Sequence, residues 1–132
     1  RYTLFDVLLP IECKRLPTPQ GRDEREYVIA GEASNFGGIQ RFKLGVHGSA
    51  HALAVMIGYI QEGQAPQWLT RVNQWLAEVG EADALWADER LAPVAMEASA
   101  VHRLRSLHRR QPRGSANIEL RHLWIALTDH PA

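Results

Sequence analysis

The apolar segment at residues 50–60, Ala-His-Ala-Leu-Ala-Val-Met-Ile-Gly-Tyr-Ile, most constrains how this chain folds. It is far shorter than the roughly 20 residues that span a bilayer, so we predict no membrane partner. A near-continuous apolar run of this length is typical of a strand that is buried on both faces. Such a strand lies at the centre of a sheet, and we predict an α/β sandwich around one central sheet.

Three further segments are predicted as strands because they are rich in β-branched and large apolar residues. They lie at residues 2–16, 101–110 and 118–127. Proline and glycine at residues 17–21 predict a loop after the first strand. Proline and glycine at residues 111–115 predict the turn of a hairpin formed by the last two.

Helices are predicted in two places. Residues 22–44 carry acids early and bases late, as the helix dipole favours, with a glycine-rich break before a second short helix at 38–43. Residues 64–80 place apolar side chains at spacings of three and four, which predicts an amphipathic helix with its tryptophans in the core and Gly80 at its end. The acidic residues 81–89 then predict a solvated connection without a chemical role.

The bulk composition predicts a single domain over residues 1–132, since the chain has 132 residues of which 45% are hydrophobic. Lys and Arg total 15, as do Asp and Glu, so no whole-molecule field attracts a polyanion and any nucleic-acid surface is local. A single cysteine, and no leader resembling a secretion signal, predict a cytoplasmic protein. Because Arg1 falls inside a predicted strand, we expect that natural sequence has been removed upstream.

Glu12 and Lys14 are the main candidates for chemistry. Side chains alternate along a strand, so these two project to the same side, while Cys13 points into the opposite layer, where we expect it to be buried. Glu12 is suited to bind Mg²⁺ (or Mn²⁺) for phosphodiester hydrolysis, with the backbone carbonyl of Cys13 as a further ligand and Lys14 as the cation near the attacking water. The alternative is a same-face ion pair worth about 0.5 kcal/mol and without function.

A wider pattern surrounds this strand. It consists of Ile-Glu-Cys-Lys-Arg-Leu at 11–16, Glu-Tyr-Val at 26–28, Gly-Ile-Gln-Arg-Phe at 38–42, Gly-x-x-Gly at 45–48 and Met-Ile-Gly-Tyr at 56–59, with a weaker echo at 106–109 and 120–124. The pattern resembles the PD-(D/E)xK, or restriction-endonuclease-like, nuclease superfamily. The resemblance implies a Mg²⁺-dependent nuclease on a mixed central β-sheet flanked by helices, with Glu12 as metal ligand and Lys14 as activating cation.

The resemblance also implies an acidic partner on a neighbouring strand. The only acid before Glu12 is Asp6, and in one extended strand their Cα atoms would lie roughly 20 Å apart at ~3.3 Å per residue. Asp6 is then a metal ligand only if Leu8-Leu9-Pro10 breaks the strand. We expect instead that the partner acid, with a first strand and a leading helix, lies upstream of Arg1, so that this fragment holds an incomplete site.

Further candidates for nucleic-acid binding lie outside that strand. Arg41 and Lys43, near a glycine-rich turn, are suited to bind backbone phosphate, and Gln40 to orient a water or a phosphate oxygen. The alternative for them is a solvated helix end. Arg109 belongs to a basic strip over residues 102–113, which is suited either to phosphate contacts or to protecting an exposed edge strand.

Two functions are left open. The first is a metal-dependent nuclease that hydrolyses DNA phosphodiester bonds, in a restriction or defence system, with DNA as its partner. The second is a non-catalytic nucleic-acid or protein-interaction domain that keeps the nuclease fold. A homodimer and a larger multidomain parent chain are both compatible with either. No spacing of His and Cys suits zinc, and Ser106 and Ser115 lack the surroundings of a nucleophile.

Overall fold

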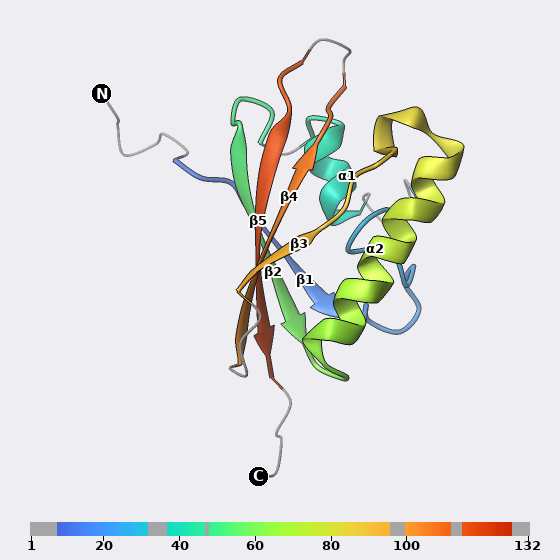
Figure 1. Cartoon of the computed structure of the whole chain (residues 1–132), viewed down its shortest axis with the longest axis vertical. Coiled ribbons are helices and arrows are strands. Elements are labelled where there is room, and N and C mark those ends of the chain that lie inside the picture. The colour runs from blue at the N-terminus through green and yellow to red at the C-terminus, as the bar shows by residue number, and fades with distance from the viewer. Residues whose placement is uncertain (1–7, 32–36, 47, 96–99, 112–114, 128–132) are drawn as a thin grey trace.

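The computed structural model describes residues 8–31, 37–46, 48–95, 100–111 and 115–127. Within these residues the chain forms a five-stranded sheet with helices packed against it (Figure 1). In chain order the elements are β1 (Ile11–Leu16), α1 (Gly38–Lys43), β2 (Leu53–Ile60), α2 (Ala65–Ala82), the 3-10 helix η2 (Ala84–Trp86), β3 (Ala92–Ala95), β4 (Val101–His108) and β5 (Ile118–Ala126). The predicted α/β class is confirmed.

The sheet is mixed, with the strand order β1-β2-β5-β4-β3. β1, β2 and β5 run parallel to one another, whereas β4 pairs antiparallel with β5 and with β3. β1 is therefore an edge strand of the described sheet, and the predicted pairing of the last two strands is confirmed. The short strand β3 has no counterpart among the predicted strands, because it is four residues long and contains Pro93.

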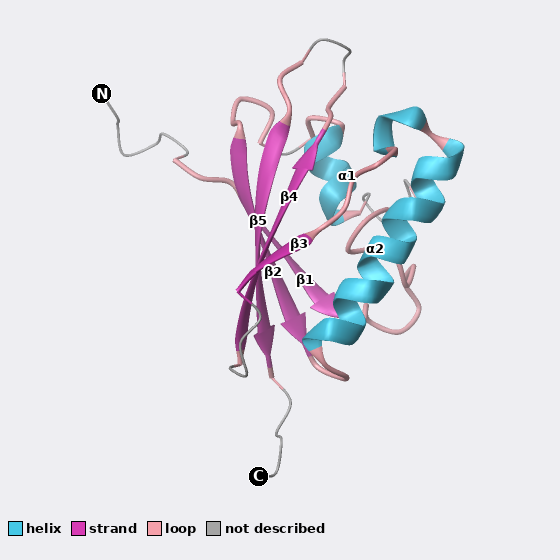
Figure 2. Ribbon diagram, viewed as in Figure 1, coloured by secondary structure: helices cyan, strands magenta, loops and turns pink. Residues whose placement is uncertain are grey.

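Both α-helices cover the same face of the sheet (Figure 2). Strand residues on that face are buried: in β2, Ala54, Met56 and Ile60 have no exposed surface, whereas Leu53 on the other face is 43% exposed. The prediction that this strand is buried on both faces is therefore wrong. Within the described residues nothing packs on the second face, which we call the open face.

The helix α2 packs its apolar side on the sheet, with Trp75 buried and Trp68 partly buried against the core. It continues through Gly80 and ends at Ala82, so the predicted helix end is wrong. A Cβ atom at Gly80 would lie 3.0 Å from the carbonyl oxygen of Trp86, so this glycine permits close packing rather than ending the helix. In the part of the chain that the structure describes, no helix is both long and apolar enough to cross a membrane.

The segment between β1 and α1 differs from the prediction. Residues 22–31 contain turns and no helix, whereas the short helix predicted at 38–43 is confirmed as α1. The carbonyls of Glu26, Tyr27 and Val28 accept hydrogen bonds from the first three amides of α1, at 2.8, 3.1 and 3.0 Å. Because another segment occupies these carbonyls, they do not continue a helix of their own.

The strand β1 begins at Ile11, later than predicted. Residues 8–10 lie outside any strand, with a bend at the first of them. The distance of roughly 20 Å between Asp6 and Glu12 was calculated for one extended strand at ~3.3 Å per residue. Residues 8–10 do not form such a strand. Asp6 itself lies outside the described residues.

Candidate functional site

Glu12 and Lys14 lie on one face of β1, as the alternation along a strand predicts. Both face the helix layer, with side chains that are 17% and 12% exposed. Cys13 projects from the opposite face and is exposed, so the prediction that it is buried is wrong. The reason is that Cys13 stands on the open face of the sheet.

The side chain of Glu26, in the turn segment after β1, lies beside Lys14. Its backbone carbonyl accepts a hydrogen bond from the amide of Gly38, the first residue of α1, at 2.8 Å. A Cβ atom at Gly38 would lie 2.8 Å from the carbonyl oxygen of Tyr27 and 3.4 Å from Cγ of Lys14. The absence of a side chain at Gly38 therefore lets α1 pack directly on β1 and hold Glu26 beside Lys14.

Two carboxylates share one ammonium at this site. Lys14 Nζ lies 3.8 Å from Glu12 Oε1 and 3.9 Å from Glu26 Oε2. Two guanidiniums flank them: Arg41 Nε lies 3.7 Å from Glu12 Oε2, and Arg22 forms an ion pair with Glu26. We call these five residues the β1 cluster; with three cations and two carboxylates it carries a net positive charge.

The carboxylates of the β1 cluster are oxygen donors of the kind that Mg²⁺ prefers. Glu26 is only 3% exposed, and its Oε1 accepts no hydrogen bond of ordinary geometry although the Arg22 guanidinium lies beside it. No group of three His, Cys, Asp or Glu side chains within the described residues is arranged to hold a metal ion. The two carboxylates therefore match such an ion in the kind of donor, without forming a metal-binding group within the described residues.

The backbone of Cys13 adds a third oxygen donor. At the two ends of the β1–β2 ladder, Pro10 O accepts from Val55 N at 3.0 Å and Leu16 O accepts from Gln61 N at 2.7 Å. In a parallel ladder the direction of the carbonyl alternates from residue to residue, so even-numbered carbonyls of β1 point at β2. The Cys13 carbonyl therefore points toward the outer edge of β1.

A groove of about 360 Å³ opens at this edge. Its lining joins residues of the β1 cluster to residues of the open face, among them Cys13, Lys14, Arg15, Arg22, Glu26 and Tyr59. A ligand in the groove therefore contacts both faces of the edge strand.

Two residues predicted on α1 as nucleic-acid contacts lie close to the β1 cluster. Arg41 belongs to it and its side chain is 27% exposed. Gln40 has a different task, because its Oε1 accepts hydrogen bonds from Ala30 N at 3.0 Å and from Gly37 N at 2.9 Å. Gln40 thus fixes the turn segment on the start of α1, which places Glu26.

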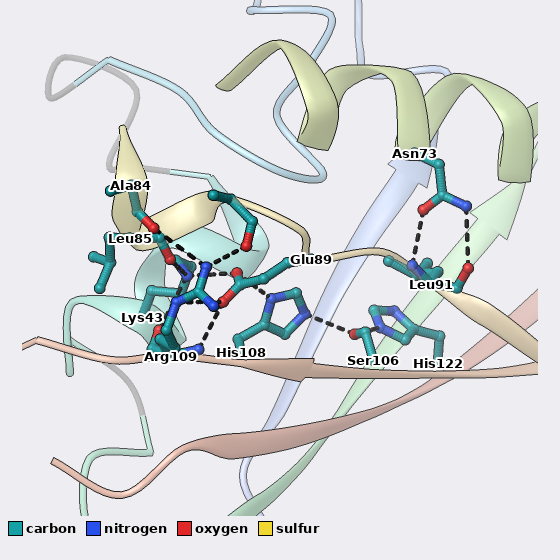
Figure 3. Close-up of polar contacts among 11 residues, drawn as sticks. Lys43, Asn73, Ala84, Leu85, Glu89, Leu91, Ser106, His108, Arg109 and His122 are labelled. Carbon is teal, nitrogen blue, oxygen red and sulfur yellow. Dashed lines mark hydrogen bonds and ion pairs between the residues drawn. The ribbon is translucent and has the colours of Figure 1, made fainter. Parts of the chain in front are cut away.

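Lys43 is fully buried and does not lie at the surface as predicted (Figure 3). Its ammonium donates to Glu89 Oε1 at 2.5 Å, to Leu85 O at 2.6 Å and to Arg109 O at 3.0 Å, which uses all three of its hydrogens. Burial lowers the pKa of Lys43, and the bond to Glu89 opposes this shift. Lys43 is therefore a structural anchor, and its buried ammonium does not contact phosphate.

Arg109 borders the same buried group. Its side chain is 45% exposed, its Nε lies 3.8 Å from Glu89 Oε2, and its guanidinium donates to the carbonyls of Ala84 and Ala87. Arg109 thus ties the segment after α2 to the end of β4 while keeping part of its side chain in solvent.

Glu89 contradicts the prediction that residues 81–89 are only a solvated connection. It is 8% exposed, and its carboxylate accepts from His108 Nδ1 at 2.8 Å and from Arg109 N at 2.7 Å. Burial by itself raises the pKa of Glu89, but the hydrogen bonds from His108, Lys43 and the backbone amide of Arg109 outweigh it and hold the pKa below its usual value. Glu89 is therefore a buried, charged partner for three residues, Lys43, His108 and Arg109.

A chain of buried hydrogen bonds runs from Glu89 across the sheet to Tyr27. His108 Nε2 and His122 Nε2 both lie 2.7 Å from Ser106 Oγ, and His122 Nδ1 lies 2.6 Å from Tyr27 Oη. Figure 3 shows the part of this chain from Glu89 to His122. We call these five residues the buried chain; it ends one residue from Glu26.

The two ends of the buried chain fix the direction of its hydrogen bonds. Trp124 Nε1 donates to Tyr27 Oη at 2.9 Å and has no other option, while the Glu89 carboxylate only accepts. Among the described partners of the Tyr27 hydroxyl, only His122 Nδ1 can accept its hydrogen. With that bond in place every later group donates toward Glu89, and both histidine rings are neutral. Burial lowers the pKa of His108 and His122 and raises the pKa of Tyr27, in agreement with this assignment.

Ser106, His108 and Glu89 follow the hydrogen-bond order of a serine-hydrolase triad. Ser106 is 3% exposed, however, and His108 has no exposed surface. A hydroxyl sealed between the sheet and the helix layer does not reach a substrate, so these three residues hold the fold together.

Comparison of the chain with protein-family models, with curated proteins and with solved structures gives no match. The β1 cluster and the resemblance in the sequence are therefore the two indications of function.

Glu26 and Glu89 are the two residues that sequence reasoning missed. Glu26 was assigned to the acidic start of a helix, and Glu89 to a solvated connection. A signal for Glu26 was available, since Glu-Tyr-Val at 26–28 belongs to the pattern around the Glu-x-Lys strand. Nothing in the sequence separates Glu89 from the acids around it, because its burial depends on Lys43 and His108.

Proposed function

We propose that this chain is a metal-dependent nuclease domain that hydrolyses DNA phosphodiester bonds, in a restriction or defence system. The observation that carries the proposal is the meeting of Glu12, Glu26 and Lys14 at the edge of β1, where both carboxylates lie within 4 Å of Lys14 Nζ. Two carboxylates beside one cation suit this chemistry, and the resemblance of the Glu-x-Lys strand to the restriction-endonuclease-like superfamily supports it.

In this proposal Glu12, Glu26 and the Cys13 carbonyl hold Mg²⁺ or Mn²⁺. The bound ion supplies positive charge for the non-bridging phosphate oxygens and acidifies water. Lys14 donates to the attacking water or to the phosphate, where negative charge develops. Glu26 is suited to its role because its buried carboxylate lies beside two cations, Lys14 and Arg22, at the edge of β1.

Arg22 and Arg41 balance the carboxylates in the absence of other cations. Arg41 Nε lies 3.7 Å from Glu12, and Arg22 pairs with Glu26. Guanidiniums that a bound metal ion would release from these carboxylates are suited to contact phosphate oxygens. The net positive charge of the β1 cluster favours a polyanionic substrate at this place.

Cleavage of supercoiled plasmid DNA with and without Mg²⁺ tests the proposal. Glu12→Gln and Lys14→Met are each expected to reduce the rate by about hundredfold or more, because each removes a group that acts at the phosphate. Glu119→Gln on β5 is the matched control, since its side chain is 20% exposed, against 17% for Glu12, and lies on the open face with Arg105 and Arg121. Parent-like cleavage by the first two variants would reject the proposal.

The same assay decides on Asp6. Because residues 8–10 do not continue the strand, the Cα distance expected for an extended strand does not apply to Asp6 and Glu12. Asp6 therefore stays a proposed ligand. A loss in Asp6→Asn as large as that in Glu12→Gln would assign it to the site, and a parent-like rate would remove it.

A non-catalytic nucleic-acid or protein-interaction domain is the second candidate. It is favoured by the pairing in the β1 cluster, where each carboxylate already has two cationic neighbours. Calorimetric titration with Mg²⁺ and Mn²⁺ separates the two candidates. Binding that is lost in Glu12→Gln supports the nuclease, whereas a protein that binds neither ion and leaves plasmid uncut supports the second candidate.

A further inference from the structure

The groove at the edge of β1 extends beyond the β1 cluster onto the open face. Arg15 and Tyr59 line this part and are direct partners in the β1–β2 register, so their side chains stand side by side. Cys13, two residues before Arg15 on the same face, lines it as well and is exposed. None of these three residues has a role in the proposed chemistry through its side chain.

The charge of the groove suits an anionic ligand. Its basic lining residues are Lys14, Arg15 and Arg22, and its one acidic lining residue, Glu26, is already paired. The guanidinium of Arg15 is held by hydrogen bonds from Nε and Nη2 to Gln61 Oε1, at 3.0 and 2.7 Å. Gln61 is neutral, so the charge of Arg15 is uncompensated by its partner and its orientation is fixed.

The shape of the groove suits one nucleotide. Tyr59 is partly exposed and gives the groove an aromatic wall of the kind on which nucleobases stack. The volume of about 360 Å³ lies at the lower end of the ~300–1,000 Å³ that is usual for sites of small ligands. A base that is paired and stacked inside a duplex does not enter such a groove.

We propose that this groove binds one unpaired nucleotide of a single-stranded polynucleotide, with the base against Tyr59 and the adjoining phosphate on Arg15. The proposal rests on the proposed nuclease function, because it runs the strand over the edge of β1 and brings the next phosphate to the β1 cluster. The substrate class is then single-stranded nucleic acid.

Cys13 reports on this groove without any substitution, since it is the one cysteine of the chain. We would measure its rate of modification by N-ethylmaleimide by mass spectrometry, in EDTA so that no cleavage occurs. The additions are oligo(dT), oligo(U), a blunt-ended duplex and inorganic phosphate. Saturating oligo(dT) is expected to slow the modification about tenfold, and the duplex and phosphate to leave it unchanged; oligo(U) shows whether the groove also accepts RNA.

Variants of the two contacts identify their roles in binding. Tyr59→Ala is expected to raise the Kd for oligo(dT) about ten- to hundredfold, whereas Tyr59→Phe, which keeps the ring, leaves it close to the parent value. Arg15→Gln is expected to lower the slope of log K against log salt concentration by about 0.7, the value for one lost phosphate contact on a single strand. Fluorescence anisotropy of labelled oligo(dT) measures both.

Equal modification of Cys13 with and without single strands, or equal protection by the duplex, would overturn the proposal. So would parent-like binding by folded Tyr59→Ala; if that variant does not fold, the unchanged protein and Arg15→Gln still decide. Metal-dependent cleavage of single-stranded circular DNA, measured beside plasmid cleavage, separates this proposal from the proposed function. Protection without any metal-dependent cleavage keeps the groove and rejects the nuclease, and cleavage without protection does the reverse.

Discussion

Glu26 is a carboxylate with almost no exposed surface, 3.9 Å from the Lys14 ammonium and beside the Arg22 guanidinium. Burying a charge of this kind costs several kcal/mol unless cations or hydrogen bonds compensate. Here two cations compensate it, and one oxygen accepts no hydrogen bond of ordinary geometry. A metal ion that takes the place of the Arg22 guanidinium at Oε1 would keep this buried carboxylate compensated, and this is the role that we propose for Glu26.

Glu26→Gln is expected to reduce metal-dependent cleavage by about hundredfold or more, because the amide keeps the shape of the side chain and removes its charge. Glu24→Gln is the matched control, since Glu24 lies in the same turn segment and is exposed. Initial rates at several Mg²⁺ concentrations are the measurement. If both variants cleave alike, Glu26 is a structural residue and the proposed ligand set loses one member.

Local alternation along β1 was enough to predict that Glu12 and Lys14 share a face and that Cys13 opposes them. The environment of each face was not predictable in the same way, because it depends on which layers pack there. Cys13 was therefore expected to be buried and is exposed. Lys43 shows the converse error, since a lysine at a helix end looks solvated in sequence and is buried through its bonds to Glu89 and two carbonyls.

Helix α1 is only six residues long, yet it places both acids of the β1 cluster. Its first amides bind the carbonyls of residues 26–28, Arg41 pairs with Glu12, and Lys43 anchors its far end to Glu89. Gly38 lets α1 approach its neighbours closely, since a Cβ atom there would lie 2.5 Å from Met56 Cε and 2.8 Å from the Tyr27 carbonyl oxygen. The position of α1 and the geometry of the β1 cluster therefore depend on each other.

Gly38→Ala is expected to lower the free energy of unfolding by about 1–3 kcal/mol, because the added methyl group meets the Tyr27 carbonyl and Met56 Cε, so α1 must move away from the turn segment and from the sheet. Cleavage is expected to fall with it. Gly31→Ala is the matched control: a Cβ atom at Gly31 meets nothing within 4 Å. Urea unfolding and plasmid cleavage are the measurements, and equal stability of the two variants would contradict this account of α1.

Periodicity and breakers identified most elements, including α1, α2 and the pairing of β4 with β5. Two failures have the same cause. Residues 22–31 were expected to be helical from the order of their charges, but α1 takes their carbonyls; Gly80 was expected to end α2, but it is needed for the contact with Trp86. In both places a contact between segments outweighs the local preference.

In the part of the chain that the structure describes, the helices cover one face of the sheet, and this face holds a continuous set of polar groups. The buried chain links Glu89, which anchors α1 through Lys43, to Tyr27, which adjoins Glu26. All its members are hydrogen-bonded only while both rings are neutral, since a protonated ring would face a donor in place of an acceptor. Glu89 and Tyr27 are thus joined by a hydrogen-bond network that is complete only with neutral His108 and His122.

The α/β class could be predicted from the sequence, because alternating strand and helix signals imply it. The open face could not, since the apolar residues at 50–60 are equally compatible with burial on one face or on two. Nor could the buried chain, whose members come from four separate segments and meet only through the register of β4 with β5. The buried chain affects the stability of the whole molecule toward acid.

The free energy of unfolding is expected to fall as the pH drops below about 6.5. Burial lowers the pKa of His108 and His122 in the folded protein, whereas in the unfolded chain both titrate near 6.5. Between the two pKa values the unfolded chain binds more protons, so acid favours unfolding by up to about 1.4 kcal/mol per pH unit for each ring; above about 6.5 neither ring contributes.

Urea unfolding at a series of pH values from about 7.5 to 5 measures this slope, and His108→Gln and His122→Gln are each expected to reduce it. Glu89 does not mask the effect, because a carboxyl with a lowered pKa keeps its stabilising contribution above its usual value near 4.5 and loses it only as the pH falls further. Each glutamine is also expected to cost about 1–3 kcal/mol at neutral pH by leaving a buried partner unpaired. A free energy of unfolding that stays constant from pH 7 to pH 5 in the parent protein would mean that the two rings are not held neutral, and the direction assigned to the buried chain would be wrong.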